Sequence, residues 1–246
     1  MPTTIPTTTS STRPGSPSTG DAYFETDTQN YIIYDGANWR GYADDGVYTQ
    51  VAVFDGTADF ISVPSSSSLS IGGSVTMTAW IRRDTTGVFG AVLAKRDTSG
   101  SNTNYQLLVR NTNVLSFYQG STLVNDTTAL SANTWYHVAV VATSGSTAFY
   151  INGSLSSSQS GTTITSTSAN LYIGQTVNQS YWDGLMHEVA IFDRALTSSE
   201  IGNIYNNKQY VSPVALYRLE GDVTDSVGSN DGTNNGVTFD NILKTS

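Results

Sequence analysis

The segments WYHVAVV (residues 135–141) and FYING (residues 149–153) decide how this chain folds. The first is apolar in both phases of an extended strand, which predicts a central strand covered on both faces. The second ends in Asn152-Gly153, two residues that tolerate the positive φ angles of a tight hairpin turn. Buried strands joined by tight turns are therefore expected to form the body of the protein.

A second strand pattern lies upstream of these segments, and a helix pattern lies downstream. Residues 75–82 alternate with the period of 2 that marks a sheet with one buried face. Thr197 and Glu200 have the spacing of a capping box, and Ile201 and Ile204 follow them. The chain is thus predicted to hold one short helix among many strands.

The composition fits one large all-β domain with an appendage. The 246 residues include 22 glycines, and only 13% are charged, which is typical of short strands joined by many turns. There is no cysteine, so no disulfide framework supports the fold. A net charge of −9 with only 11 lysines and arginines argues against nucleic-acid binding.

Two targeting features are missing from the sequence. No stretch approaches the ~20 consecutive apolar residues of a membrane span. The first residues have neither the basic start nor the apolar run of a secretory signal. We therefore expect no membrane span and no secretion signal.

Six segments follow one another in an order that resembles the laminin-G-like branch of the concanavalin A-like jelly rolls. They are Val53–Gly56, Thr76–Ile81, Trp135–Val141, Phe149–Gly153, Leu171–Gly174 and Val189–Thr197. The resemblance implies an all-β fold, a two-sheet antiparallel jelly-roll sandwich with one short helix that closes it. It assigns residues 47–246 to this sandwich.

One piece of the resemblance stands in an unusual place. Residues 215–222, with Asp225 and Asp231-Gly232 after them, are similar to a segment that normally precedes the Phe-Asp-Gly strand of the family. The domain therefore looks circularly permuted, with residues 213–240 completing it. We expect residues 214–220 to lie beside the strand from Val51 or the strand from Val189. A truncated second domain and strand addition to a neighbouring subunit are the alternatives.

The amino-terminal part has a different composition. Residues 1–12 are rich in Thr, Ser and Pro and predict a flexible arm. Residues 13–46 predict a small β-meander that resembles a short element of bacteriophage virion proteins. Its aromatic residues are Tyr23, Phe24, Tyr31, Tyr34, Trp39 and Tyr42. Units below ~40 residues seldom fold unaided, so these side chains are expected to mediate attachment or oligomerisation, with docking on the chain's own sandwich as the alternative.

The sequence offers no catalytic residues. A retaining glycosidase needs two carboxylates ~5 Å apart. Glu188 is the only glutamate in a clear sandwich strand, and Met186 and Ala190 are its neighbours on the same face. No activated serine, phosphate loop or zinc-type histidine pair is present either. We expect the protein not to be an enzyme.

Calcium and glycans are the two ligands that the sequence leaves open. No cofactor is required, but laminin-G-like relatives often hold calcium at the sandwich rim, and carboxylates that could do so are Asp55, Asp59, Asp222, Asp225 and Asp231. Aspartate also favours turns for backbone reasons. Loop aromatics stack on sugars, and the glycan candidates are Tyr105, Tyr118, Tyr181, Trp182 and Asp183. Alternatively, these residues anchor their loops to the rest of the protein and contact no ligand.

These observations favour a non-catalytic bacteriophage virion protein, a head decoration or fibre-like subunit that displays a laminin-G-like domain. The expected partners are other virion proteins of the capsid or tail and sister copies in a homo-oligomer. The expected location is the particle surface, after assembly in the host cytoplasm. The alternative is a carbohydrate-binding module for adsorption to a host surface, and a glycosidase that uses Glu188 is a third hypothesis.

Overall fold

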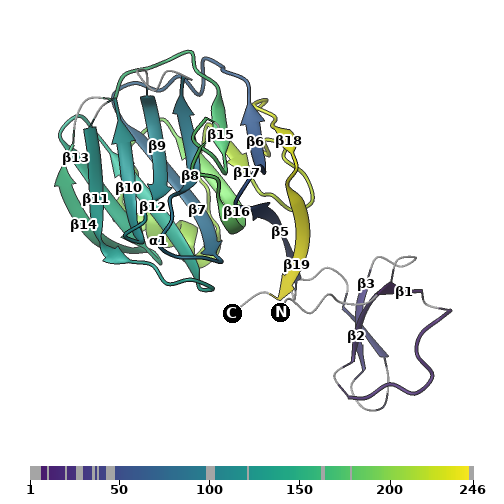
Figure 1. Ribbon diagram of the computed structural model, residues 1–246. Coiled ribbons are helices and arrows are strands. Elements are labelled where there is room, and N and C mark those ends of the chain that lie inside the picture. Colours follow the sequence, from purple (N-terminus) through teal and green to yellow (C-terminus); the bar gives the residue numbers. More distant parts are fainter. Residues whose placement is uncertain are drawn as a thin grey trace. The chain divides into compact units, whose positions relative to one another are not determined.

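The computed structural model describes most of the chain as two compact units (Figure 1). The described residues are 7–9, 11–19, 21–25, 30–34, 37, 39–42, 48–97, 103–120, 122–161, 164–177 and 179–243. Unit 1 comprises Met1–Gln50 with Asn241–Ser246, and unit 2 comprises Val51–Asp240. Among the described residues, no helix has the length and apolar character needed to cross a membrane.

Unit 1 contains a small four-stranded sheet. Its order is β1 (Thr7–Thr8), β2 (Ala22–Glu25), β3 (Asn30–Tyr34) and β4 (Trp39–Tyr42). β1 runs parallel to β2, and the other pairs are antiparallel. The short strands expected within residues 13–46 are therefore present as β2 to β4.

The side chains of unit 1 are described only in part. Ile32 is fully buried, and Tyr23 and Tyr34 are half-buried. The side chains of Phe24, Tyr31, Trp39 and Tyr42 lie outside the described residues. The attachment role of these aromatic residues stays a prediction.

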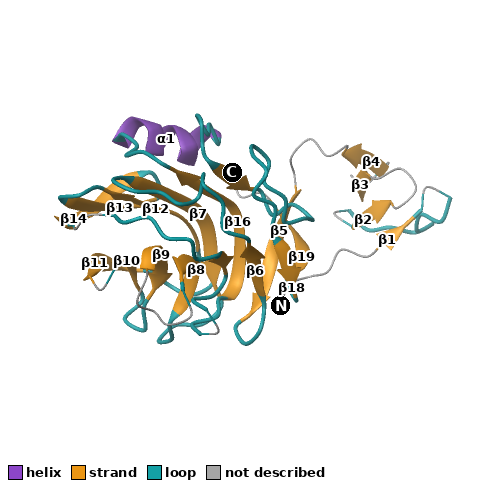
Figure 2. Cartoon of the chain, turned by 90° about the horizontal axis from the view of Figure 1, so that it is seen from above, coloured by secondary structure: helices purple, strands orange, loops and turns teal. Residues whose placement is uncertain are grey.

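Unit 2 is a sandwich of two antiparallel sheets, which confirms the predicted fold class (Figure 2). The order of the seven-stranded sheet is β11 (Thr122–Ala129), β10 (Val114–Gln119), β9 (Thr103–Val109), β8 (Gly90–Arg96), β15 (Leu171–Ile173), β6 (Phe60–Val63) and β18 (Thr233–Asn235). The order of the eight-stranded sheet is β14 (Ser154–Ser160), β13 (Ser146–Ile151), β12 (Trp135–Ala142), β7 (Val75–Arg83), β16 (Asp183–Phe192), β5 (Tyr48–Asp55) and β19 (Thr238–Leu243), with β17 (Ala215–Tyr217) also paired to β16.

The core lies between the two sheets and follows the predicted alternation. In β7, Met77, Ala79 and Ile81 face the core, and in β12, Val138 and Val140 do the same. Between β13 and β14, the turn at residues 152–153 has φ angles of 49° and 76°, as the hairpin pattern predicts. Alternating strands thus place one apolar phase in the sandwich interior.

The other phase of the eight-stranded sheet lies beneath helix α1 (Ser198–Asn207) (Figure 2). Ala139 and Val141 of β12 form a second apolar cluster with Ile201 and Ile204 of the helix. The predicted capping box is confirmed, since the Thr197 side chain accepts a hydrogen bond from the Glu200 amide and the Glu200 side chain accepts one from the Thr197 amide. β12 is therefore apolar in both phases because both of its faces are covered.

The carboxyl-terminal segment completes both sheets within the same chain. β17 pairs antiparallel with β16, with Tyr217 opposite Val189, which confirms the expected place beside the strand from Val189. The Tyr217 hydroxyl is buried and donates to the Asn230 carbonyl over 2.7 Å. β18 pairs with β6 at the edge of the other sheet. That this arrangement is a circular permutation stays a prediction.

His137 is buried under the helix in an aromatic cluster. Its ring lies 5.5 Å from Trp80 and 5.8 Å from Tyr205, measured between ring centroids. Neither ring nitrogen has a hydrogen-bond partner among the described residues. Burial disfavours the charged imidazolium and lowers the pKa of His137 from its ordinary value of 6.5 to about 3.

We predict that His137 makes the fold sensitive to acid. Below pH 6.5 the unfolded chain binds a proton that the folded chain does not bind until about pH 3, so the free energy of unfolding falls as the pH falls through this window. Replacement His137→Phe removes this contribution, which is worth about 1.4 kcal/mol for each unit of pKa difference. Urea denaturation between pH 7 and pH 3 measures it. Val140→Ala, a core change without a titrating group, should keep the wild-type pH dependence. Identical acid sensitivity in His137→Phe would contradict the prediction.

Candidate functional site

A groove of about 390 Å³ lies on the seven-stranded sheet, at strands β8 to β10. Gln106 and Tyr118 stand opposite each other on β9 and β10, and their neighbours Leu107 and Phe117 point into the core. Since successive side chains of a strand alternate between faces, Gln106 and Tyr118 point away from the core. The volume falls in the range of small-molecule sites.

The groove combines aromatic rings with neutral polar groups and one cation. The lining residues include Phe89, Arg96, Gln106, Tyr118, Thr176 and Gln179. Arg96 donates from Nη1 to the Gln106 side-chain oxygen over 3.4 Å, and its Nε has no partner among the described residues. No carboxylate occurs among the described lining residues. Such a surface offers donors, acceptors and π-faces to a ligand rich in hydroxyl groups.

Phe89 lies at the margin of this groove on an exposed loop. Its side chain is 42% exposed, which is unusual for a phenylalanine. The Arg110 guanidinium lies 5.6 Å from the centroid of the Phe89 ring. This cation–π contact holds the ring at the surface beside the groove.

Thr176, Gln179 and Ser180 line one side of the groove, and backbone hydrogen bonds tie the described residues of this loop to β8. The Gly174 amide donates to the Val92 carbonyl over 3.1 Å, and the Ala91 amide donates to the Ser180 carbonyl over 2.9 Å. Within the loop, Val177 and Ser180 both have a φ angle of 51°. A left-handed φ is rare for a β-branched residue, and backbone strain of this kind clusters at ligand-binding sites.

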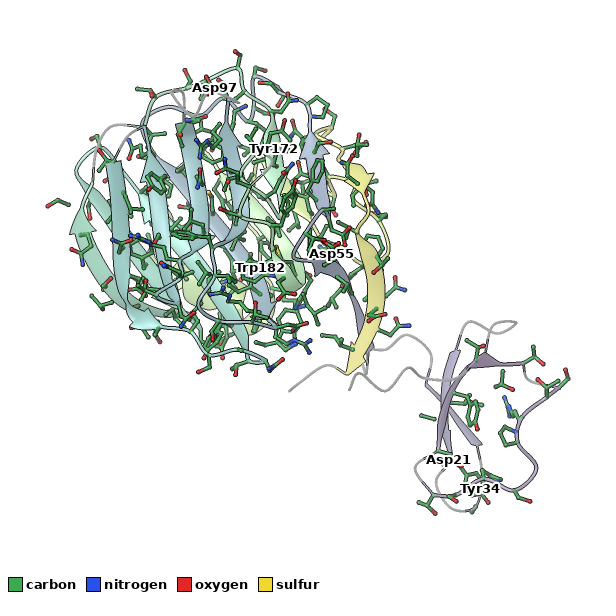
Figure 3. The ribbon with its side chains drawn as sticks, in the orientation of Figure 1. Asp21, Tyr34, Asp55, Asp97, Tyr172 and Trp182 are labelled. Atoms are coloured by element: carbon green, nitrogen blue, oxygen red, sulfur yellow. The ribbon has the colours of Figure 1, made fainter. Side chains whose placement is uncertain are left out.

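Two of the five glycan candidates are buried, and their predicted exposure was wrong. Tyr105 is fully buried in the core, where its hydroxyl donates to the Leu69 carbonyl over 3.0 Å. Trp182 is also fully buried (Figure 3). A β-carbon on Gly90 would lie 3.0 Å from the Trp182 ring, so the ring packs closely against that glycine. Trp182 anchors the loop, as the alternative interpretation proposed.

The other three candidates differ in their surroundings. Tyr118 lines the groove, so its glycan role stays a prediction. Tyr181 is half-buried and is not among the described lining residues. Asp183 accepts a hydrogen bond from the Thr85 hydroxyl over 2.7 Å. Sequence reasoning missed Arg96, Gln106 and the loop residues, because only the pairing of β8, β9 and β10 and the path of the loop before β16 bring them beside Tyr118.

The five aspartates proposed as calcium ligands accept hydrogen bonds from nearby backbone amides. Asp55 accepts hydrogen bonds from the Thr57 hydroxyl and from three backbone amides, and these bonds hold its pKa well below the ordinary value. Asp225 accepts from the amides of residues 216, 227 and 230, and Asp231 accepts from the Asp225 amide. Asp59 accepts from the Asp55 amide and Asp222 from the Thr224 amide. Within the described ranges, no three acidic, histidine or cysteine side chains group as metal ligands. Calcium binding stays a prediction.

Glu188 is engaged in a structural network. It lies at a bulge of β16 with a φ angle of 54°, and its side chain is 1% exposed. Its Oε1 lies 3.1 Å from Arg218 Nη1 and 3.6 Å from Lys208 Nζ. The buried charge is thus compensated by Lys208 at the end of α1 and by Arg218 just after β17.

Residues 54–202 match a family model described as the concanavalin A-like lectin/glucanases superfamily, which covers more than half of the chain. The chain belongs to this superfamily. The matched range includes the residues that line the groove and most strands of both sheets. Among curated proteins, no sequence matches the chain.

Solved structures of this superfamily fold are similar to the chain. A proposed carbohydrate-binding protein from Bacteroides ovatus is 20% identical, with a TM-score of 0.66 over 93% of this chain and 71% of that one. A heptameric SAP-like pentraxin from Limulus polyphemus is 16% identical, with a TM-score of 0.56 over 78% and 94%. Domain 4 of AbnA, a GH43 extracellular arabinanase from Geobacillus stearothermophilus solved with arabinotriose, is 18% identical, with a TM-score of 0.53 over 63% and 76%. At these identities the likeness is one of fold.

We predict that Trp182→Ala destabilises the protein by about 3–5 kcal/mol, the usual cost of removing a large buried aromatic side chain. Tyr181→Ala, a change at the half-buried neighbour, should cost clearly less. Urea denaturation of both variants measures the difference. If Trp182→Ala keeps wild-type stability but no longer binds a sugar, the structural role of Trp182 is wrong and the residue contacts the ligand instead.

Proposed function

We propose that the sandwich is a non-catalytic carbohydrate-binding module and that the groove beside Tyr118 is its binding site. The observation that carries this proposal is the groove itself, in which rings, amides and a guanidinium line about 390 Å³. Structural neighbours that are described as carbohydrate-binding, and the arabinanase domain solved with arabinotriose, support the same ligand class.

The lining suits sugars for two physical reasons. The face of an aromatic ring packs against the C–H groups of a sugar ring and excludes water from them. The side chains of Arg96 and Gln179 can donate to or accept from hydroxyl groups around that contact. A few placed polar groups around an apolar contact are typical of small-molecule sites.

The absence of carboxylates from the described lining favours binding over hydrolysis. Glycoside hydrolysis in most families needs two carboxylates within about 5–10 Å of each other. Glu188, the catalytic residue of the glycosidase hypothesis, is buried between Arg218 and Lys208. A module with this groove would therefore hold a glycan without cleaving it.

Tyr118→Ala is predicted to weaken glycan binding at least tenfold, because stacking on an aromatic ring is lost. Tyr118→Phe keeps the ring and should keep most of the affinity. Glycan arrays of bacterial and plant polysaccharides identify a ligand, and calorimetry with the wild type and both variants measures the affinities. No binding by the wild type, or equal binding by a folded Tyr118→Ala variant, would refute the site.

The separate sheet of unit 1 supports a second proposal, display of the module on a bacteriophage particle. Unit 1 is a compact unit of its own, and β2 to β4 lie in the segment that resembles virion proteins. Host glycans at a particle surface would then be the ligands of the displayed groove. In this proposal the partners of unit 1 are other virion proteins and sister copies.

Deletion of residues 1–46 is predicted to leave a folded sandwich that no longer joins the particle. The sandwich holds the larger core, so its melting temperature should change little. Mass spectrometry of purified virions measures incorporation of the full-length and the shortened chain. Normal incorporation of the shortened chain would place attachment elsewhere, and absence of the full-length chain from virions would end the proposal.

A further inference from the structure

The arginines of unit 2 differ in whether a carboxylate accompanies them. Three form ion pairs: Arg82 with Asp84, Arg194 with Glu200, and Arg218 with Glu188. Among the described residues, Arg83, Arg96 and Arg110 have no carboxylate within ion-pair distance. Of these three, Arg96 is the one that lines the groove. The described chain therefore supplies no opposite charge to the cation of the groove.

Arg96 makes little use of its hydrogen-bond donors within the protein. It is the last residue of β8 and is half-buried. Among the described residues its one hydrogen bond runs from Nη1 to the side-chain oxygen of Gln106, and 3.4 Å is long for a charged donor. Its Nε has no partner in that part of the chain. Since a guanidinium has five N–H donors, the protein satisfies only a small part of their capacity.

A half-buried guanidinium in a neutral groove favours an anionic ligand. Moving a cation partly out of water costs free energy unless an opposite charge compensates it. The other described lining residues carry no formal charge. Asp97, the next residue in the chain, lies at the upper end of the strands in Figure 3 and is not among the described lining residues. A planar guanidinium matches two oxygens of a carboxylate or sulfate group better than it matches one hydroxyl group.

The groove also places an aromatic ring near this cation. Tyr118 on β10 stands opposite Gln106 on β9, and Gln106 is the residue to which Arg96 donates. Side chains in direct register have β-carbons only about 4.5–5.5 Å apart. Tyr118 lines the groove and is half-buried, so part of its ring is open. A sugar in contact with Tyr118 can therefore present a substituent to Arg96.

The opposite end of the groove offers no second cation among the described lining residues. Phe89, which directly precedes β8, lies at that end, whereas Arg96 is the last of the seven residues of this strand. At about 3.4 Å per residue the two ends are ~20 Å apart. Arg110 lies against the Phe89 ring and donates to Asn125, but it is not among the described lining residues. A single acidic group, at the Arg96 end, is therefore expected.

We propose that the groove selects an acidic sugar, whose carboxylate or sulfate group pairs with Arg96 while the sugar ring packs on Tyr118. The inference rests on the proposed glycan-binding function and adds the charge of the ligand and the residue that recognises it. Uronates and sulfated sugars share the chemistry that Arg96 recognises, oxygens that share a negative charge. The net charge of −9 does not oppose this contact, because at ~0.15 M salt exposed charges more than about 8 Å away are largely screened.

Matched pairs of sugars test the charge of the ligand. The probes are the methyl glycosides of glucuronate, galacturonate, glucose 6-sulfate and galactose 6-sulfate, each compared with its neutral parent by calorimetry on the full-length protein. In a pair that binds, the acidic member should bind at least about tenfold more tightly, because a charge-assisted pair replaces a neutral hydrogen bond. The methyl ester of a bound uronate has no charge and should bind like the neutral parent. Binding of only the uronates or only the sulfated sugars supports the inference and identifies the acidic group.

Variants test the role of Arg96. Arg96→Gln removes the charge and should reduce the ratio of acidic to neutral affinity to about one. Arg96→Lys keeps the charge without the planar fork and should keep only part of the ratio. Arg82→Gln is the matched control, since it removes an arginine that pairs with Asp84 and is not among the described lining residues, and it should keep the wild-type ratio.

Three outcomes separate this inference from the proposed function. Equal affinity of the wild type for acidic and neutral members would overturn the inference while the groove keeps its proposed function, and so would an unchanged ratio in a folded Arg96→Gln variant. The comparison of sugars uses the wild type alone, so it decides the question even if Arg96→Gln does not fold. No binding of any glycan, acidic or neutral, would overturn the proposed function together with the inference.

Discussion

Strand β16 holds together segments that lie far apart in the chain. One of its edges pairs with β7, and its other edge pairs first with β5 and then with β17. The change of partner falls at the bulge of Glu188, whose buried carboxylate contacts Arg218 and Lys208. A buried carboxylate without partners would cost several kcal/mol, so these contacts stabilise the point where the carboxyl-terminal segment joins the sheet.

The start of the same strand determines the shape of the groove. Trp182 directly precedes β16, its carbonyl accepts from the Gly56 amide and its amide donates to the Gly174 carbonyl. Its ring packs on Gly90, at the beginning of β8. Trp182 and Gly174, which flank the groove residues Thr176, Gln179 and Ser180, are therefore fixed to the sandwich core. Val177 and Ser180 between them have left-handed backbones. A rigid support beneath a strained loop is a common way to hold a binding surface in place.

The two outer faces of the sandwich differ because the chain covers only one of them with its described helix. Beneath α1 lies an apolar cluster, and His137 is fully buried beside the half-buried rings of Trp80 and Tyr205. The opposite outer face carries Tyr118, Gln106 and Tyr172 in one row, with polar groups between the rings. The first face contributes to stability, and the second carries the groove.

Much of the fold could be predicted from local patterns. The period of 2 in residues 75–82, the turn at Asn152-Gly153 and the capping box at Thr197 each depend on neighbours in the chain, and each is present. The place of β17 beside β16 was also predicted, from resemblance and not from periodicity. Of the glycan candidates, only Tyr118 lies in the groove, because an aromatic residue near a loop has the same local pattern whether it anchors the loop or faces the solvent.

The amino-acid sequence by itself determined which residues alternate between the two faces of each strand, and so the two-layer architecture. It could not determine which residues of different strands stand side by side. Tyr118, Gln106, Ala94 and Tyr172 come from four strands, and Tyr172 is more than fifty residues from its neighbours along the chain. Register is set by backbone hydrogen bonds between distant segments, and only the tertiary structure makes them. For the same reason, the sequence alone does not show that Tyr105 and Trp182 are buried.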